Sequence, residues 1–245
     1  MNPIVLIPAR MAATRLPGKP LADIAGVPMI VRVLRQAEAA GVGPVAVAAG
    51  DPEIVDAVQA AGGRAVLTDP DLPSGSDRIL AALRQIDPGG AHDVVVNLQG
   101  DIPFLAPAVV KAVTGLLADQ PSCDISTVMV AEADPAERTN PDIPKVVAAM
   151  QLGGRTARAL YFTRSTLYGD GPVWLHHGVY GYRRAALERF TAAAPSPLEL
   201  RERLEQLRAL ELGMQIWAAV IDEAPISVDN PSDLERARAH ARTTA

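Results

Sequence analysis

Apolar residues follow two alternating patterns along the first half of the chain. Short runs of consecutive apolar residues predict buried strands, whereas longer segments with apolar residues three or four positions apart predict amphipathic helices. The strands predicted in this way are residues 3–7, 45–49, 64–68 and 93–98. The predicted helices are 28–41, 76–86 and 106–118. A fourth predicted helix begins at Asp51–Pro52 and ends at about residue 61. Strands and helices that alternate over short connections predict an α/β fold with a doubly wound, mostly parallel sheet.

The pattern is less regular in the second half of the chain. The predicted strands here are 124–131, 144–150, 157–163, 177–183 and 214–221. An apolar stripe predicts one amphipathic helix over residues 197–212, and its members are Leu200, Leu204, Leu207 and Leu210. The run Asn230–Pro231–Ser232–Asp233 predicts the start of the last helix. We interpret the chain as one domain, residues 1–245, with a lobe inserted at about 132–195.

The composition of the chain excludes several classes of protein. The chain has 245 residues, of which 49% are hydrophobic and 21% charged, so it can bury a large core. Its formal net charge of -5 argues against a protein that binds nucleic acid, because such proteins are usually basic. The single cysteine, Cys123, forms no intrachain disulfide and no cysteine metal cluster. With no visible secretory signal and no long apolar run, we expect a cytoplasmic protein that does not insert in a membrane.

A cluster of cations follows the first predicted strand. The loop 8–21 contains Arg10, Arg15 and Lys19 and no acidic residue, although the chain as a whole is acidic. Ligands of open α/β sheets bind at the carboxyl ends of the strands, so the loop predicts a site for a polyphosphate. It is not a Walker A motif, because Pro20 follows Lys19 where that motif has Ser or Thr. The alternative is a surface loop with three solvated charges.

Two aspartates are candidate metal ligands. Asp101 ends the run Gln99–Gly100–Asp101 after the strand 93–98, and Asp229 precedes the last predicted helix. Mg²⁺ commonly binds one or two carboxylates together with substrate phosphates, so the two residues suit a site for phosphoryl chemistry. The alternative for Asp101 is an ordinary turn residue, and the alternative for Asp229 is a helix cap.

The turn Ser74–Gly75 is a further candidate for nucleotide binding. With Ser76, Asp77 and Arg78 it opens the helix 76–86, so its backbone amides could contact a base or a phosphate. Ser74 could equally be an ordinary N-cap.

The second half of the chain offers candidates for a second substrate. Lys145 and Arg164 could pair with a carboxylate, and the alternative for each is a solvated surface charge. The doublet His176–His177 is not expected to bind one metal ion, because adjacent residues of a strand point to opposite faces. The polar face of the helix 197–212, with Glu205 and Arg208, is expected to be solvated.

The motifs taken together resemble the 3-deoxy-manno-octulosonate (Kdo) cytidylyltransferases, the CMP-Kdo synthetases of Gram-negative bacteria. The resemblance runs through nearly the whole chain. Its motifs are IPARMAATRLPGKPL at 7–21, SGSDR at 74–78, VNLQGD at 96–101, KVV at 145–147, LYFTR at 160–164, HHGVYGY at 176–182, PSPLE at 195–199, LEQLR at 204–208 and VDNPSDLERAR at 228–238.

The resemblance implies a fold, an activity and two substrates. The fold is the nucleotide-diphospho-sugar transferase type, a three-layer α/β sandwich in which an inserted lobe shapes the sugar site and the contact of a homodimer. The activity is transfer of CMP from CTP to Kdo, with release of pyrophosphate and with Mg²⁺, for lipopolysaccharide biosynthesis.

The resemblance also implies roles for individual residues. Contacts to CTP would come from Ala9, Arg10, Arg15, Lys19, Ser74, Gly75, Arg78 and Gln99. Mg²⁺ would be held by Asp101 and Asp229. The acid sugar would face Gln99, Lys145, Arg164, His176, Tyr180, Glu205 and Gln206.

The chain departs from the family pattern in three places, and the last of them concerns the choice of sugar. Ile102 follows Asp101 where family members often have Glu, the motif SGSDR replaces SGTER, and the segment 165–175 is shorter than in the enterobacterial form. A cytidylyltransferase for another acid sugar, such as a sialic-like sugar or 8-amino-Kdo, is therefore an alternative. A non-catalytic nucleotide-binding domain is another. An NAD-dependent oxidoreductase is not expected, because no Gly-x-Gly-x-x-Gly follows the first strand.

Overall fold

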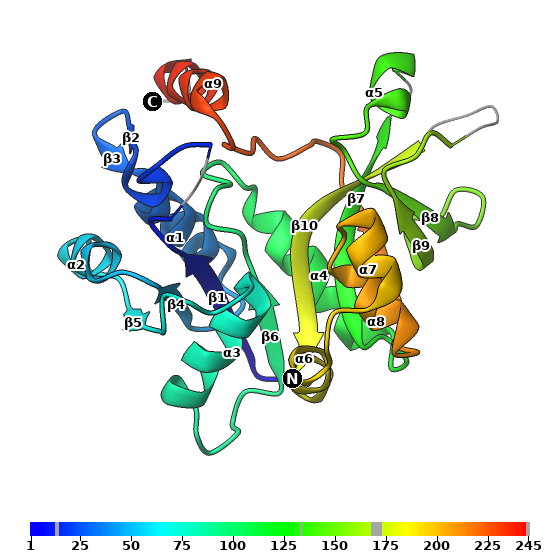
Figure 1. Ribbon diagram of the computed structural model, residues 1–245, viewed down its shortest axis with the longest axis horizontal. Helices are drawn as coiled ribbons and strands as arrows, with labels where there is room; N and C mark the ends of the chain where they lie inside the picture. The colour runs from blue at the N-terminus through cyan, green and yellow to red at the C-terminus, as the bar shows by residue number, and fades with distance from the viewer. Residues whose placement is uncertain (13–14, 133, 168–172, 244–245) are drawn as a thin grey trace. The chain divides into compact units, whose positions relative to one another are not determined.

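The computed structural model describes residues 1–12, 15–132, 134–167 and 173–243 (Figure 1). The chain forms two compact units. Unit 1 comprises Met1–Lys111 and Pro225–Ala245, and unit 2 comprises Ala112–Ala224. Unit 2 is thus one continuous segment between the two parts of unit 1, and it is longer than the inserted lobe predicted at about 132–195.

The sheet of unit 1 is parallel, as predicted. Its strands lie in the order β5–β4–β1–β6, and every pair in this order is parallel. Their bounds are Pro3–Ala9 for β1, Val45–Ala49 for β4, Ala65–Leu67 for β5 and Val94–Asn97 for β6. Each lies within two residues of its predicted bounds at either end. Strands β1, β4 and β6 are almost fully buried. Strands that are buried on both faces have nearly continuous apolar sequences, which is why the apolar runs predicted them.

Helices pack on this sheet and on its loops. Helices α1, α2 and α3 contact strands β1, β4 or β5. The helices of the first part of the chain are α1 (Met29–Ala40), α2 (Pro52–Ala60), α3 (Gly75–Ile86) and α4 (Pro107–Asp119), the last of which continues into unit 2. Each of the four helices predicted in the first half of the chain is confirmed. Helix α1 ends at Gly41, whose φ of 63° is the left-handed conformation that glycine adopts at low cost.

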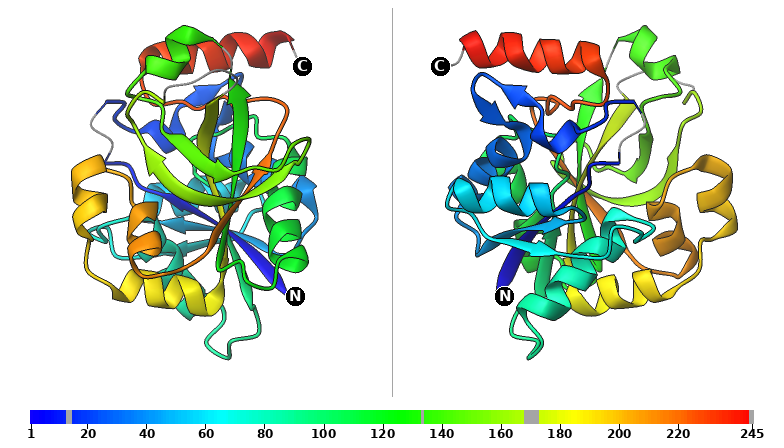
Figure 2. Two further views of the ribbon diagram at one scale, coloured as in Figure 1. Left: turned by 90° about the vertical axis from the view of Figure 1, so that its right-hand side faces the viewer. Right: turned by 60° about the vertical axis from the view of Figure 1, so that its left-hand side comes forward.

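The C-terminal part of unit 1 packs against its N-terminal part. Helix α9 (Pro231–Thr243) lies beside the hairpin of β2 (Asp23–Ile24) and β3 (Val27–Pro28), as Figure 1 and Figure 2 both show. A buried apolar cluster joins the two segments, and its members are Ile24, Met29, Val228, Leu234, Ala237 and Ala241. The hairpin was not predicted, because two-residue strands leave no periodic pattern.

The sheet of unit 2 is mixed. Its strands lie in the order β10–β7–β11–β9–β8, and β10 also pairs with β8. Only β7 and β11 are parallel among the described pairs, so the prediction of a mostly parallel sheet is wrong for this unit. The bounds are Ile125–Glu132 for β7, Lys145–Ala149 for β8, Thr156–Thr163 for β9, Val173–Arg183 for β10 and Ile216–Val220 for β11. Strand β10 begins earlier than the predicted 177–183.

The helices of unit 2 are short. They are α5 (Pro135–Thr139), α6 (Arg184–Ala192), α7 (Pro197–Glu202) and α8 (Gln206–Glu211). The prediction of one helix over 197–212 is wrong, because Arg203 has a φ of 56° and ends α7 in the left-handed conformation. The turn also breaks the leucine stripe, so that Leu204 and Leu207 are buried while Leu200 is exposed.

In the part of the chain that the structure describes, no helix combines the length and the apolar character that crossing a membrane requires.

Candidate functional site

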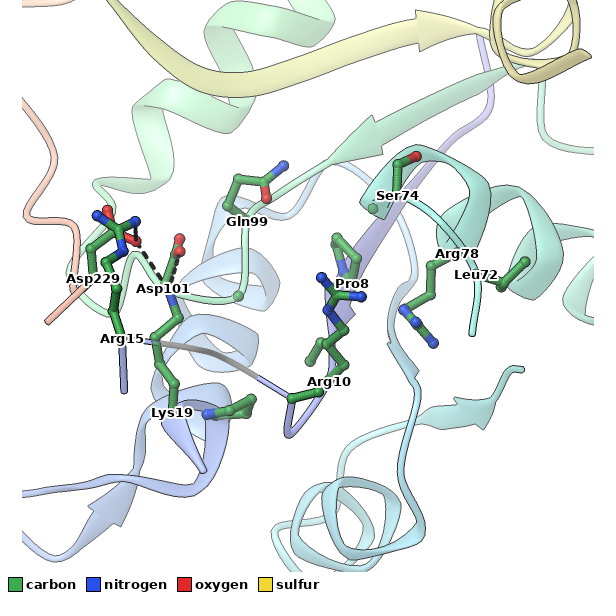
Figure 3. A pocket seen from close by; sticks show the side chains of 15 residues that line it. Pro8, Arg10, Arg15, Lys19, Leu72, Ser74, Arg78, Gln99, Asp101 and Asp229 are labelled. Carbon is green, nitrogen blue, oxygen red and sulfur yellow. Dashed lines mark hydrogen bonds and ion pairs between the residues drawn. The ribbon is translucent and has the colours of Figure 1, made fainter. Parts of the chain in front are cut away.

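A cavity of about 370 Å³ opens in unit 1 at the carboxyl ends of β1 and β6 (Figure 3). Every unit 1 residue that the sequence predicted to bind nucleotide or metal lines this cavity. These residues are Ala9, Arg10, Arg15, Lys19, Ser74, Gly75, Arg78, Gln99, Asp101 and Asp229. The structure therefore brings together segments from four distant parts of the sequence, as predicted, and their binding of a nucleotide or a metal ion stays a prediction.

Hydrogen bonds fix the start of the cation loop. The backbone N–H of Met11 donates to Oδ2 of Asp51 at 2.7 Å, and the N–H of Gly50 donates to the carbonyl of Ala9 at 2.8 Å. Asp51 lies at the N-cap position of α2, but its side chain makes no capping hydrogen bond. Its carboxylate anchors the loop beside Arg10 instead. Sequence reasoning missed this role.

Lys19 lies between the two candidate metal ligands. Its Nζ is 2.7 Å from Oδ2 of Asp101 and 3.3 Å from Oδ1 of Asp229 (Figure 3). Arg15 also reaches Asp229, with Nη2 3.1 Å from Oδ1. The Lys19 side chain is 17% exposed and that of Arg15 is 68% exposed, so the first pair is much less screened by water than the second. The carboxylates of Asp101 and Asp229 thus converge on one cation.

A glycine allows Asp101 to take its place. A Cβ on Gly100 would lie 2.9 Å from the carbonyl oxygen of Pro8, closer than carbon and oxygen can approach, so the turn after β6 packs against the end of β1 only with glycine here. The N–H of Val228 donates to the carbonyl of Asp101 at 3.0 Å. This bond ties the segment before α9 to the turn. Ile102, which departs from the family pattern, is buried and contributes no charge.

Asp229 does not cap α9. Asn230 accepts from the N–H of Asp233 at 3.0 Å, and Oδ2 of Asp233 accepts from the N–H groups of Asp229 and Asn230 at 2.9 and 3.2 Å. Because Asn230 and Asp233 satisfy the start of the helix, the Asp229 carboxylate is left to face the cavity. The interpretation of Asp229 as a helix cap is wrong.

Ser74 is the N-cap of α3, as the alternative interpretation had it. Its Oγ accepts from the N–H of Asp77 at 3.1 Å and donates to the carboxylate of the same residue at 2.7 Å. Ser74 and Gly75 nevertheless line the cavity, so the turn has both properties. Contact between this turn and a nucleotide stays a prediction.

The guanidinium of Arg78 braces the loop after β5. It is 2% exposed and donates to Oγ1 of Thr68 at 2.8 Å and to the carbonyls of Asp69 and Pro70 at 3.0 and 3.1 Å. Burial, followed by the nearby charge of Arg10, lowers the pKa of Arg78. Gln99 donates to Oδ1 of Asn97 at 3.3 Å.

In unit 2, Lys145 and Arg164 hold one turn. The Lys145 side chain is fully buried, and its Nζ donates to the carbonyls of Asn140 and Arg164. Burial lowers the pKa of Lys145, and the charge of Arg164 lowers it further. Arg164 Nη1 donates to the carbonyls of Pro141 and Asp142 at 3.1 and 2.8 Å. The alternative of a solvated charge is wrong for Lys145.

Strand β10 carries both histidines. Burial, with a smaller effect of His177, lowers the pKa of His176 to about 3, and burial lowers that of His177 to about 4. His176 Nε2 is 3.0 Å from Oγ1 of Thr127, and its ring lies 5.4 Å from that of Tyr180. Burial also raises the pKa of Tyr180, as do the nearby Tyr182 and Glu205. Both histidines are therefore neutral at pH 7.

Arg208 is buried, and the expectation that it is solvated is wrong. It makes a bidentate ion pair with Glu199, with distances of 2.7 and 2.6 Å, and its guanidinium lies 4.6 Å from the ring centroid of Phe190. Gln206 is 7% exposed, and its buried Nε2 has no hydrogen-bond partner among the described residues. An unpaired buried amide of this kind is available to a ligand.

Among the described residues, no group of three or more His, Cys, Asp or Glu side chains is arranged to hold a metal ion. A cation at Asp101 and Asp229 would therefore draw its remaining ligands from a substrate or from water. Mg²⁺ accepts such a mixed set, whereas structural Zn²⁺ sites use four protein ligands.

Comparison with known proteins gives consistent results. The family model described as cytidylyltransferase matches residues 4–216. The chain is 59% identical over 239 residues to the 3-deoxy-manno-octulosonate cytidylyltransferase of Parvibaculum lavamentivorans, a match that covers 97% of this chain and 92% of the relative. It is 56% identical to the enzyme of the same name from Rhodospirillum centenum, over 97% of this chain and 93% of the relative.

Solved structures agree with these relatives. A CMP:2-keto-3-deoxy-manno-octonic acid synthetase complexed with CTP superposes with a TM-score of 0.92 at 35% identity, over the whole of both chains. A nucleotidyl transferase from Methanothermobacter thermautotroptrophicus superposes with a TM-score of 0.64 at 16% identity, over 100% of this chain and 99% of the other. The second likeness is one of α/β fold alone.

Proposed function

This chain belongs to the 3-deoxy-manno-octulosonate cytidylyltransferase family, and on that premise we propose that it transfers CMP from CTP to Kdo and releases pyrophosphate. The observation that carries the proposal is the cavity of unit 1, which Arg10, Arg15 and Lys19 line together with two convergent carboxylates. Cations suit a triphosphate, and the carboxylates suit the metal ion that accompanies one.

The residues present fit Mg²⁺. Asp101 and Asp229 already direct oxygens at one cation, the Lys19 ammonium, which stands where a metal ion would be held. When bound, Mg²⁺ would neutralise charge on the triphosphate and lower the pKa of a coordinated hydroxyl. The chain itself would then supply position and electrostatic stabilisation, which dominate phosphoryl-type transfer.

In the proposed reaction, the anomeric hydroxyl of Kdo attacks the α-phosphorus of CTP. The new bond joins that oxygen to phosphorus, and the hydroxyl proton passes to solvent. The bond from the α-phosphorus to the β-phosphate oxygen breaks, so that pyrophosphate leaves with the electron pair. Arg15 and Lys19 stabilise the charge of the departing pyrophosphate. The backbone of Ala9 and the turn Ser74–Gly75 contact the cytosine.

We propose that unit 2 contributes the contacts to the acid sugar. Gln206 supports this assignment, because its buried Nε2 is unpaired among the described residues. Neutral His176 and the protonated Tyr180 hydroxyl suit the hydroxyl groups of a sugar. The remaining residues proposed in unit 2 are Lys145, Arg164 and Glu205, and Gln99 of unit 1 is proposed to contact the sugar as well. Part of the segment 165–175 lies outside the described residues, so the choice among eight-carbon or nine-carbon acids rests on the substrate test below.

We also propose that the protein is a cytoplasmic homodimer that serves lipopolysaccharide biosynthesis. The family resemblance supports these three statements. The exposed side chains of Leu152 and Leu160, both in unit 2, are consistent with a surface that another chain covers.

The test is pyrophosphate release from CTP with Mg²⁺ and a panel of acid sugars. We expect release with Kdo, and we expect Asp101→Ala to lower kcat/KM at least about a hundredfold, because the variant loses a group that holds charge in the transition state. Asp222→Ala is the matched control, because Asp222 is 81% exposed and pairs only with Arg155 among the described residues. Faster release with a sialic-type acid or 8-amino-Kdo would favour the alternative substrate. CTP binding without release with any sugar would indicate a binding domain.

A further inference from the structure

Lys19 does more than point toward the cavity. Its ammonium bridges two carboxylates that lie 82 and 210 positions away in the sequence, and it is the less exposed of the two cations there. An ammonium has three donors and no acceptor, so it can serve two carboxylate oxygens at once. Asp101 and Asp229 would otherwise place like charges close together, which is unfavourable.

We propose that Lys19 and the divalent cation use the same pair of carboxylates in turn. This inference rests on the proposed function and extends it. Before substrate arrives, the Lys19 ammonium occupies the position between Asp101 and Asp229 and keeps both carboxylates oriented. When the nucleotide brings the metal ion, Lys19 leaves the aspartates and pairs with phosphate oxygens.

Charge balance supports the exchange. Arg15, Lys19, Asp101 and Asp229 carry two positive and two negative charges, so the group is neutral as the structure shows it. A free divalent cation would add two positive charges and would have to displace an ammonium that has no other acidic partner among the described residues. A metal–triphosphate complex is negatively charged overall, and it offers the displaced ammonium new acceptors.

The consequence is that the enzyme binds metal poorly without nucleotide. A ligand that must first displace an occupant has its affinity reduced by the fraction of molecules in which the site is open. Lys19 therefore acts as a specificity-determining residue, because it couples occupation of the metal position to the arrival of the triphosphate.

Binding of Mn²⁺ in the absence of nucleotide tests the proposal without measuring activity. Electron paramagnetic resonance counts free Mn²⁺ during a titration of the wild-type protein and of Lys19→Met. We expect the variant to bind Mn²⁺ about tenfold more tightly, as an unblocked site should. Arg15→Met is the matched control, because Arg15 is 68% exposed and contacts only Asp229 of the pair. It should change the affinity much less.

Two further variants complete the experiment. The double variant Lys19→Met with Asp101→Asn should not bind Mn²⁺ more tightly than the wild-type protein. That result would show that the Mn²⁺ bound by Lys19→Met lies at these carboxylates. Lys19→Gln should repeat the gain, and it replaces Lys19→Met if thermal unfolding shows that the latter is not folded.

Equal or weaker Mn²⁺ binding by the folded Lys19 variants would overturn the proposal, and so would binding too weak to detect in all proteins. The proposed function is judged separately by pyrophosphate release from the wild-type protein. If the wild-type protein releases pyrophosphate but the Lys19 variants bind Mn²⁺ no more tightly than it does, the proposed exchange is rejected and the proposed function is not.

Discussion

Asp51 shows how a single residue can serve the site from outside it. Its carboxylate accepts the N–H of Met11 forty positions earlier, and this bond fixes the backbone between Arg10 and the rest of the cation loop. The sequence predicted a helix cap here, because an Asp–Pro pair is typical of a helix start. Capping rules consider neighbours in sequence, so they cannot identify a partner on another strand end.

Asp51→Ala should release the loop and weaken CTP binding. A hydrogen bond to a charged group contributes about 1.5–3 kcal/mol, so we expect the KM for CTP to rise roughly tenfold or more while kcat changes little. Asp51→Asn keeps an acceptor oxygen and should recover part of the affinity. Steady-state kinetics at saturating sugar measure the split.

Asp56→Ala is the control for general effects on α2, because Asp56 is an exposed residue of the same helix. A fall in kcat with KM unchanged would contradict the positioning role of Asp51.

At the scale of elements, an ion pair shapes α7 and α8. Glu199 belongs to a capping box with Ser196 at the start of α7, and it also receives the guanidinium of Arg208 from α8. Burial by itself would raise the pKa of Glu199, but the hydrogen bonds from Arg208 and Ser196 hold it below its usual value. The ion pair thereby joins the two helices across the turn that contains Arg203 and Glu205.

Glu199→Ala should destabilise the protein strongly. It leaves the charge of Arg208, a residue only 7% exposed, without its bidentate partner, and breaking such a buried pair costs about 3–5 kcal/mol. Urea unfolding followed by circular dichroism measures the loss. The double variant Glu199→Gln with Arg208→Met should recover much of the stability, because neither charge of this buried pair remains. A loss below 1 kcal/mol for Glu199→Ala would show that the pair is dispensable.

Helices and strands were predicted well where the hydrophobic pattern of the segment alone determines its structure. They were predicted poorly where contacts between residues distant in sequence determine it. The strands of unit 1 follow directly from their apolar runs. The leucine spacing at 197–212 satisfies a continuous helix, yet the chain turns at Arg203 into the left-handed conformation, which costs energy for any residue with a Cβ. The ion pair of Glu199 with Arg208 spans that turn, and neither its geometry nor the burial of Lys145 can be obtained from local patterns.

The clustering of the residues that line the cavity was predicted more completely than the fold around them. The carboxyl ends of parallel strands meet at one edge of a sheet, so residues after β1 and β6 must be neighbours wherever they lie in the sequence. That rule brought Arg10 and Asp101 together without any structure. It could not show that Lys19 would lie between the aspartates, since ion pairing depends on side-chain reach.

At the scale of the whole molecule, pH should affect the stability of unit 2. The folded pKa values of His176, about 3, and His177, about 4, lie below the unfolded value of 6.5. The unfolded chain therefore binds more protons as pH falls below 6.5, and stability decreases. When the pH falls from 7 to 5, we expect each histidine to lower the free energy of unfolding by about 2 kcal/mol.

Both tryptophans of the chain, Trp174 and Trp217, belong to unit 2, so their fluorescence during urea unfolding reports on the unit that holds the histidines. His177→Leu should remove about half of the pH dependence in this range. A stability that does not change between pH 7 and pH 5 would contradict the buried neutral state of both rings.

The discontinuity of unit 1 has a consequence for biosynthesis. Asp229 and the apolar residues of α9 are translated only after the whole of unit 2. A nascent chain that stops before Pro225 therefore has the cation loop and Asp101 but only one of the two carboxylates, and the partners of Ile24 and Met29 are missing. Vectorial synthesis thus delays the completed metal position until unit 2 has been translated. A product that terminates before Pro225 lacks one carboxylate of that position and exposes apolar residues that chaperones and proteases recognise.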